Sequence, residues 1–445
     1  MPILNNFDSQ YINDASETAN GLMSLYDKTK LDNIKLSDVD YIKNGLNEIK
    51  EYRVPQFIYG IKIDPTNPDP NTCVTYTDNA TGFIPLTVNQ STGVCNYGSW
   101  STIINDILGI KPCLVKKDGT VLSYLNPNDY SKTVDGNTVD INTGDFGQVM
   151  IKFKHIYYRF SMDGNKIWFQ ISNKQPDDTW IDTAFASEDG IGTIKKEMFI
   201  AAYESSLVNN TLQSLSNKLP SQQLSFENIE NLSEFGVFHM MNIVRKQFII
   251  FLGYLVTKSI DLKGKIGRGN TSTVIKSGTM NSKGLFYGKS NNNEGVKLFG
   301  IENLWGNQLK YMHGIVQKMT YVLDSSTGLT TPEQHLYIKE FYPYNKIDDF
   351  DDCGKISSNQ SGYISSIKFL NKSIYIPNGL NGSTSTYYKS YYQNGTSEDA
   401  TDRLYGIYGG STVYGDKVGP EFLMINYLDK HLEKKITDCT THIIY

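Results

Sequence analysis

Short runs of alternating apolar and polar residues, separated by turn residues, dominate the chain from about residue 56 onward. Alternation puts successive side chains on opposite faces of a strand, so these runs predict β-structure. The expected strands cover residues 57–63, 72–76, 121–125, 148–158, 166–172 and 198–203. Residues 162–165 (Met-Asp-Gly-Asn) predict a hairpin turn between two of them, because Gly and Asn tolerate positive φ.

Two later segments have helical spacing instead. Residues 101–108 predict a short helix, and residues 233–257 predict one long helix with Ser233 as its N-cap. The long segment carries a wide apolar stripe formed by Val237, Phe238, Met241, Val244, Phe248, Phe251, Leu252 and Leu255. Arg245, Lys246 and His239 fall off this stripe. A helix this apolar is expected to be the central packing element of its domain.

The first 55 residues form a separate, polar segment. Ser37 is a plausible N-cap for a helix over residues 37–52, which Pro55 follows. Its apolar residues (Val39, Ile42, Leu46 and Ile49) are spaced as in a two-heptad seam. Two interpretations remain open: an amphipathic helix packed on the body, or a bundle of three chains. Residues 1–55 are therefore expected to serve attachment or oligomerisation, ahead of a β-rich first part of the body at 56–147.

Composition and charge narrow the function further. The 445 residues carry 42 Lys and Arg against 47 Asp and Glu, a net charge of −5, which argues against nucleic-acid binding. The longest apolar run, residues 248–256, is too short for membrane insertion. Five cysteines without a CxxC pair are expected to be reduced thiols of a chain made in a reducing cytosol.

Catalytic chemistry is not indicated by any motif. Residues 264–269 hold three glycines but lack the spacing of a nucleotide-binding loop, and the six histidines are scattered. Residues 348–352 contain four aspartates, which favours a solvated acidic loop over a hard-cation site. No cofactor, metal or catalytic residue is expected. A carboxylate pair for glycoside hydrolysis remains an alternative, although no pair stands out.

Tyrosine gathers in one polar segment near the end of the chain. Residues 377–415 contain seven of the 30 tyrosines: Tyr387, Tyr388, Tyr391, Tyr392, Tyr405, Tyr408 and Tyr414. Tyr offers a large contact area at low entropic cost, and the surrounding Gly, Ser and Asn offer adaptable polar contacts. We therefore interpret the seven as a contact surface for a receptor. The alternative is that they pack on each other or on a neighbouring subunit.

Residues 297–309 combine glycine, amide and aromatic side chains at the spacing of a tight turn. Gly300 and Gly306 would allow positive φ, Asn303 and Asn307 would hydrogen-bond the turn backbone, and Trp305 would be buried. We interpret this segment, the turn motif, as part of the scaffold.

The turn motif resembles the "G-[IL]-x-[ND]-x-x-G-N" signature of the formylglycine-generating-enzyme-like branch of the C-type lectin fold. Residues 147–158, 184–185, 199–204 and 406–411 resemble the other signatures of that branch, in the same order. Residues 437–444 would then be its closing strand beside the first. The resemblance implies an α+β fold, mostly β with few helices, and a C-type-lectin-like domain over residues 148–445.

A further resemblance is to tail and fibre proteins of phages and prophages of Gram-positive bacteria. It rests on residues 59–70 (Tyr-Gly-Ile-Lys-Ile-Asp to Asp-Pro), 74–82 (Val-Thr-Tyr-Thr-Asp-Asn-Ala-Thr-Gly), 110–113 (Ile-Lys-Pro-Cys) and 124–129 (Tyr-Leu-Asn-Pro-Asn-Asp). Together with the lectin-like signatures, the resemblance covers about residues 56–445.

The chain departs from the enzyme branch where that branch has reactive cysteines. Residues 412–415 are Thr-Val-Tyr-Gly, and Tyr408 and Thr412 replace the Arg and Trp of the family's late strand. The oxidase activity is therefore not implied.

The resemblance implies a virion protein of the phage tail that is made in the bacterial host cytoplasm. It would bind a bacterial cell-surface glycan or protein as a homotrimer joined to other tail or baseplate proteins through residues 1–55. The alternatives are a structural baseplate or virion accessory protein and a tail-associated polysaccharide depolymerase.

Overall fold

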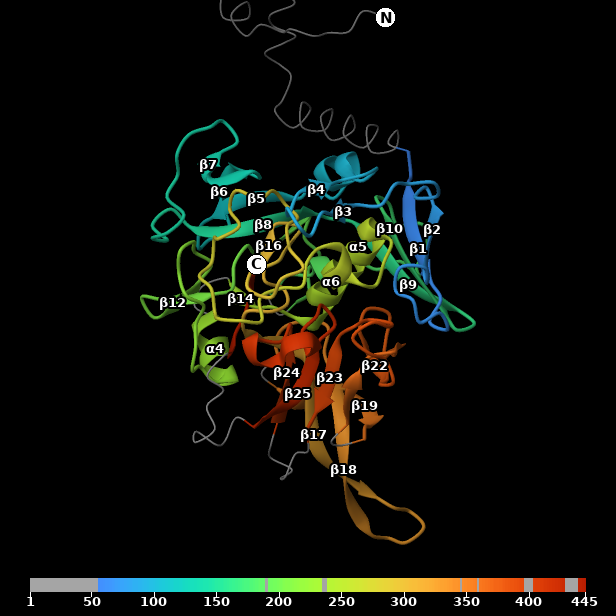
Figure 1. The fold of residues 1–445 in the computed structure, drawn as a ribbon. Coiled ribbons are helices and arrows are strands. Elements are labelled where there is room, and N and C mark those ends of the chain that lie inside the picture. The colour runs from blue at the N-terminus through green and yellow to red at the C-terminus, as the bar shows by residue number, and fades with distance from the viewer. Residues whose placement is uncertain are drawn as a thin grey trace, which may run out of the picture. The chain divides into compact units, whose positions relative to one another are not determined.

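The computed structural model describes residues 55–188, 191–233, 238–344, 346–357, 360–395, 403–428 and 439–445. The chain divides into two compact units, Met1–Gln56 and Phe57–Tyr445. The helix expected at residues 37–52 lies outside the described residues. The second unit is mostly β-structure with few helices, as the strand pattern predicts, and has three larger sheets (Figure 1).

The first sheet is antiparallel and contains both halves of the predicted hairpin. Its order is β2 (Val74–Asp78), β1 (Ile58–Ile63), β10 (Lys166–Ser172) and β9 (Tyr157–Asp163). Asp163 pairs with Lys166, so Gly164 and Asn165 form the turn at its predicted place. The prediction of one strand over residues 148–158 is wrong, because these residues belong to two strands in different sheets, β8 (Gln148–Lys154) and β9.

The second sheet joins the two expected parts of the body, because β5 pairs with β8. Its order is β14 (His239–Met240), β27 (Ile443–Ile444), β11 (Glu197–Ala201), β8 (Gln148–Lys154), β5 (Lys111–Val115), β6 (Val121–Asn126) and β7 (Asp129–Thr133). The closing strand β27 lies between β11 and β14, one strand away from β8.

The third sheet is built around the longest strand, β17. Its order is β19 (Asp351–Lys355), β18 (Thr330–Ile338), β17 (Leu309–Leu323), β24 (Arg403–Tyr408), β25 (Leu423–Leu428), β23 (Tyr391–Asn394) and β20 (Ser361–Tyr363). The short strand β26 (Cys439–Thr440) runs parallel to β17. Because β26 and β27 follow each other, the end of the chain ties the second sheet to the third.

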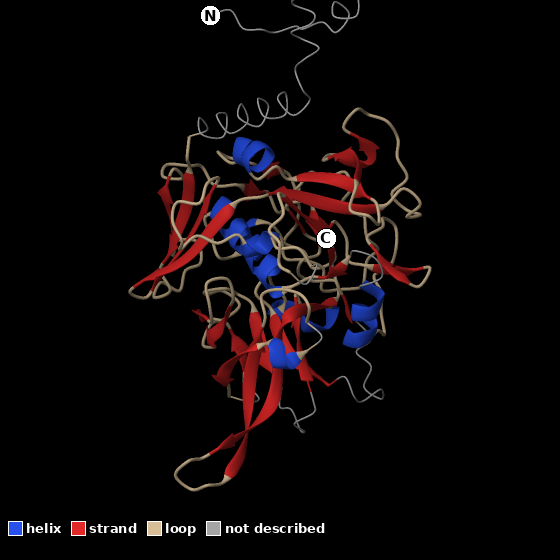
Figure 2. Ribbon diagram, turned by 180° about the vertical axis from the view of Figure 1, so that it is seen from behind, coloured by secondary structure: helices blue, strands red, loops and turns tan. Residues whose placement is uncertain are grey.

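Smaller elements connect the sheets (Figure 2). The two-stranded pairs are β3–β4 (Thr87–Val88, Cys95–Asn96), β12–β13 (Ser206–Val208, Thr211–Gln213), β15–β16 (Lys297–Leu298, Ile301–Glu302) and β21–β22 (Ser366–Phe369, Tyr375–Gly379). The helices are η1 (Ile103–Ile107), η2 (Thr183–Phe185), α4 (Phe226–Ser233), α5 (Ile243–Thr257), α6 (Leu262–Lys265), η3 (Ile347–Asp349) and η4 (Thr412–Lys417). The expected short helix at 101–108 is thus present as η1.

The long helix begins later than the apolar stripe predicts. Ser233 is the last residue of α4, and α5 starts after Asn242, whose side chain accepts a hydrogen bond from the Arg245 backbone N–H. Between them, His239–Met240 pairs with β27 instead of forming helix. The apolar run is long enough for one helix. However, His239 and Met240, in its first part, pair with a strand near the end of the chain. Among the described residues, no helix could span a membrane.

Every residue of α5 is buried, including the charged pair that falls off its apolar stripe. Arg245 donates to the carbonyl oxygens of Ala184 and Ala186, at 3.0 and 2.6 Å. Lys246 lies 3.2 Å from the Glu421 carboxylate. Arg245 Nη1 has no hydrogen-bond partner among the described residues, but it lies 3.6 Å from Glu188 Oε1. Both cations of the helix are therefore buried beside a carboxylate, as buried charges require.

Aromatic rings fill the space between α5 and the first sheet. The Phe251 ring centroid lies 4.8 Å from that of Phe160 and 5.4 Å from that of Phe169. Phe248 contacts Tyr158, with centroids 4.8 Å apart. The prediction that this helix forms the centre of the packing is confirmed by its complete burial.

Replacing Phe251 by alanine should lower the free energy of unfolding by about 3–5 kcal/mol, because the cavity would open beside at least two other rings. Urea unfolding followed by fluorescence measures this change. Ile84→Ala is the control, since Ile84 is 64% exposed, and it should change stability by less than about 0.5 kcal/mol. Equal effects of the two substitutions would contradict a packing role for α5.

Candidate functional site

The turn motif has the backbone geometry that its residues suggest. Gly300, Asn303, Gly306 and Asn307 have φ of 89°, 56°, 81° and 63°, all in the left-handed region. A Cβ on Gly306 would lie 2.8 Å from the backbone N and O of Asn270, so glycine is required there for a close approach as well. Trp305 is fully buried and donates from Nε1 to the Gly267 carbonyl oxygen at 3.1 Å.

A buried carboxylate, Glu204, organises this turn. It follows β11 and accepts hydrogen bonds on Oε2 from the Nδ2 groups of Asn303 and Asn307, at 3.2 and 2.5 Å. The Gln308 backbone N–H donates to Oε1 at 3.3 Å. The same asparagines accept on Oδ1 from the backbone N–H groups of Val296 and Ile275, at 3.3 and 2.9 Å. The amides therefore bridge the carboxylate and the backbone.

Lys310 supplies the positive charge that balances Glu204. Its Nζ lies 2.9 Å from Glu204 Oε1, and both side chains are almost completely buried. The same ammonium donates to the carbonyl oxygens of Gly306 and Gln308, at 2.9 and 2.5 Å. A buried ion pair is tolerated when further hydrogen bonds satisfy the remaining donors and acceptors, as they do here. The turn motif is thus held by charge pairing, which makes it a structural centre.

A second buried carboxylate, Glu302, lies in the same motif. Backbone N–H groups of Gly278 and Met280 donate to it at 2.8 and 3.1 Å. Burial raises the pKa of Glu302 to about 7, and burial lowers the pKa of nearby Lys297 to about 8. Lys297 donates to the Met280 carbonyl oxygen at 2.9 Å and lies 3.8 Å from the ring centroid of Tyr130. These partners are again internal to the fold.

Tyr408 belongs to the core and not to a contact surface, which corrects its assignment. Its hydroxyl lies 2.9 Å from His442 Nδ1, and His442 Nε2 lies 2.9 Å from the Glu302 carbonyl oxygen. Since a carbonyl only accepts, Nε2 carries the hydrogen, and the Tyr408 hydroxyl donates to Nδ1. Burial, followed by the nearby Lys310 charge, lowers the pKa of His442 to about 3.

Tyr388 and Tyr392 are also buried, at 2% and 7% exposed, so the prediction that they face a receptor is corrected. Tyr392 alternates with half-buried Tyr391 along β23, and the strand turns one ring inward and the other outward. Tyr388 follows Tyr387, which has a φ of 55°, and packs near the ring of Tyr254. Composition could not distinguish the buried tyrosines from the partly exposed ones, because both have polar neighbours in the sequence.

Four of the seven tyrosines keep partial exposure: Tyr387, Tyr391, Tyr405 and Tyr414. Tyr405 stacks on Phe226 with centroids 3.6 Å apart, which leaves little of its ring for a partner. Tyr391 forms an edge contact with Tyr363 of β20, at 5.2 Å between centroids, and Lys417 Nζ lies 4.4 Å from the Tyr391 centroid. We call Tyr363, Tyr391 and Lys417 the tyrosine cluster.

Sequence reasoning did not include Tyr363 and Lys417 in the contact surface. Tyr363 lies outside the Tyr-rich segment and reaches it because β20 pairs with β23, with Tyr363 opposite Tyr391. Lys417 ends η4. Neither has a local sequence signal: strand pairing between separated segments positions Tyr363, and Lys417 approaches Tyr391 from a helix.

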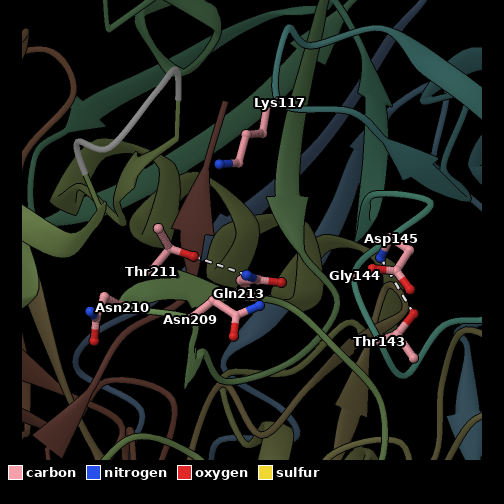
Figure 3. A pocket seen from close by; sticks show the side chains of 8 residues that line it. All are labelled: Lys117, Thr143, Gly144, Asp145, Asn209, Asn210, Thr211 and Gln213. Atoms are coloured by element: carbon pink, nitrogen blue, oxygen red, sulfur yellow. Dashed lines mark hydrogen bonds between the residues drawn. The ribbon is translucent and has the colours of Figure 1, made fainter.

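A polar hollow of about 300 Å³ lies at another part of the unit (Figure 3). Its lining comes from three loops that are distant in sequence: Lys117, Thr143, Gly144, Asp145, Asn209, Asn210, Thr211 and Gln213. Amide, hydroxyl, carboxylate and ammonium groups all contribute. None of these residues was singled out from the sequence, because the loops show no motif.

The acidic segment at 348–352 does not gather its carboxylates. Asp349 lies 3.5 Å from Lys339 Nζ, while Asp352 lies 2.9 Å from His335 Nδ1 and accepts from the Gly354 backbone N–H. Among the described residues, no three His, Cys, Asp or Glu side chains come together as metal ligands.

Glu204→Gln should destabilise the protein by about 3–5 kcal/mol, because it leaves the buried Lys310 charge without its partner. Thermal and urea unfolding measure the loss. Glu294→Gln is a matched control: Glu294 pairs with Lys289 at 2.8 Å in a partly exposed position, where such a pair contributes about 0–1 kcal/mol. A similar small loss at Glu204 would show that the turn motif does not depend on this charge.

His442 should make stability fall as the pH is lowered from about 7 toward 4. Its pKa in the folded chain is about 3, against about 6.5 when unfolded, so in that range only the unfolded chain binds the proton. In urea unfolding at several pH values, His442→Gln should reduce this dependence by up to about 1.4 kcal/mol per pH unit. Buried His239 and His313 remain in both proteins, so parallel curves would contradict the assignment.

Comparison with protein-family models gave no match to this chain, and comparison with curated proteins gave none either.

Proposed function

We propose that the chain is a non-catalytic tail-fibre or tail-tip protein of a phage virion, and that it binds a receptor on the bacterial surface. The observation that carries this proposal is the turn motif. Its residues match the lectin-like signature, and the buried charges beside it are satisfied by internal partners, Glu204 by Lys310 and by amides. Such a motif stabilises a frame and leaves recognition to the surface.

The absence of the enzyme branch's cysteines supports a non-catalytic role. Residues 412–417 form η4 here, with Thr412, Val413 and Tyr414 after the strand that carries the late signature. The described cysteines Cys73, Cys95, Cys113 and Cys353 are free, and burial raises the pKa of the first three to about 12. Thiols with such pKa values are poor nucleophiles.

The tyrosine cluster, which includes Tyr391 of the Tyr-rich segment, is the surface best suited to contact a receptor. Tyr391 and Tyr363 present partly exposed rings, and Lys417 adds a cation beside them. Tyr387 and Tyr414 are also half-buried and extend the candidate set. Rings with a polar edge can pack on sugar or on protein while their hydroxyl groups make hydrogen bonds.

The remaining parts of the proposal concern assembly. A C-type-lectin-like body over residues 148–445 would display the contact surface, and residues 1–55 would join the chain to other tail or baseplate proteins. A homotrimer fits the heptad spacing at residues 39–49. The chain would be made in the host cytoplasm and would act on the virion.

Fluorescently labelled full-length protein should bind cells of at least one strain in a panel of Gram-positive bacteria. Tyr391→Ala should weaken this binding about tenfold or more, as truncation of a central aromatic contact does. The control is Tyr321→Ala, because Tyr321 is 59% exposed and is not part of the Tyr-rich segment. It lies on β17, opposite Pro332 of β18; Figure 1 shows the hairpin that these two strands form. Flow cytometry over a protein titration measures both affinities.

Failure of the wild-type protein to bind any strain would contradict the proposal. Release of soluble sugar fragments from the cells, lost on replacement of one Asp or Glu, would favour a depolymerase instead. Particles that adsorb normally without the protein would favour a structural accessory.

A further inference from the structure

We infer that the polar hollow beside the β12–β13 hairpin is a binding site for an uncharged carbohydrate. This inference rests on the proposed function, because it names a ligand class and a second place of contact for a protein that recognises a bacterial surface. The hollow lies on the loops around the second sheet, whereas the tyrosine cluster lies on the third.

A tight hairpin fixes one wall of the hollow. Val208 pairs with Thr211, so only Asn209 and Asn210 form the turn. Their φ angles are 50° and 56°, the left-handed pair that a type I′ turn requires. Both side chains are exposed and lie at the hollow (Figure 3). The turn therefore presents two amide groups on a rigid backbone, which lowers the entropic cost of binding.

Gln213 forms the floor and is only 9% exposed. Its Nε2 donates to the Val208 carbonyl oxygen at 3.2 Å and to Thr211 Oγ1 at 2.9 Å, which fixes the orientation of the amide. Within the described part of the chain, Oε1 of Gln213 has no hydrogen-bond partner. A nearly buried acceptor held in this way is ready to receive a ligand hydroxyl.

The opposite wall is a loop that depends on Gly144. Its φ of 87° is in the left-handed region that favours glycine, and a Cβ there would lie 2.3 Å from the present position of Gln213 Oε1. Thr143 Oγ1 donates to Asp140 Oδ2 at 2.6 Å, and its lone pairs remain acceptors. Asp145 follows in the same loop and also lines the hollow.

The charges of the lining favour an uncharged ligand. Lys117 is its one cation and Asp145 its one anion, so the lining has no net charge. A phosphate polymer would be met by the carboxylate as well as by the ammonium, and one carboxylate is too few for a hard cation. Amides and hydroxyls both donate and accept hydrogen bonds, as neighbouring sugar hydroxyls require.

An exposed aromatic residue follows the lining residues of the Gly144 loop in the chain. Phe146 follows Asp145 in the chain and is 52% exposed, although it is a large apolar side chain. Pyranose rings have apolar C–H faces that pack on aromatic rings, while their hydroxyl edges need polar partners. The polar groups that line the hollow meet the second need and would not suit a purely apolar ligand.

The double substitution Asn209→Gly and Asn210→Gly tests the site without disturbing the turn, because glycine accepts both φ angles. Full-length protein is titrated on a printed panel of uncharged oligosaccharides of hexoses and N-acetylhexosamines, with poly(glycerol phosphate) as the anionic comparison. We expect wild-type binding to at least one uncharged oligosaccharide, and about tenfold or greater weakening in the double variant. Asn165→Gly, in the exposed β9–β10 turn, should bind like wild type.

Three results would overturn the inference: no binding to the uncharged panel, binding to poly(glycerol phosphate) alone, or equal binding by wild type and double variant. Thermal unfolding confirms that the variants are folded, and Asp145→Asn, an exposed replacement of equal shape, provides a second test with expected weakening. The same samples are applied to cells. Wild-type binding to cells without panel binding rejects the hollow and keeps the proposed function, whereas absence of cell binding rejects the proposed function.

Discussion

The Glu204 carboxylate lies where water cannot solvate it, so the protein must supply every group that stabilises its charge. Lys310 and the amides of Asn303 and Asn307 do this from residues about 100 positions later in the chain. Desolvation of an unpaired charge costs several kcal/mol. The turn motif therefore takes the conformation that brings these groups to Glu204, and β17 begins at Leu309, the last residue of the motif.

The same principle extends to α5. Its cations Arg245 and Lys246 are buried beside carbonyl oxygens and the carboxylate of Glu421, and the hydroxyls of Tyr254 and Tyr375 donate to that carboxylate at 2.6 and 2.7 Å. The apolar face of the helix provides most of the burial, while the polar contacts determine its orientation.

The sequence pattern predicted the backbone conformation correctly where interactions between neighbouring residues decide it. The β9–β10 hairpin follows from Gly164 and Asn165, and the left-handed angles of the turn motif follow from its Gly and Asn residues. The start of α5 could not be predicted, because residues before Asn242 have apolar periodicity but pair with the distant strand β27. Strand pairing across about 200 residues competes with helix formation and leaves no trace in local spacing.

The sequence by itself determined the strand-rich class, the β9–β10 turn and the left-handed positions of the turn motif, because these depend on φ preferences and side-chain alternation. Only the tertiary structure decided which tyrosines are buried. Tyr392 is buried, whereas its neighbour Tyr391 on the same strand is only half-buried. It also brought Asn209, Asp145 and Lys117 around one hollow. Such groupings arise from contacts between separate segments, whose geometry is set by how the whole core packs.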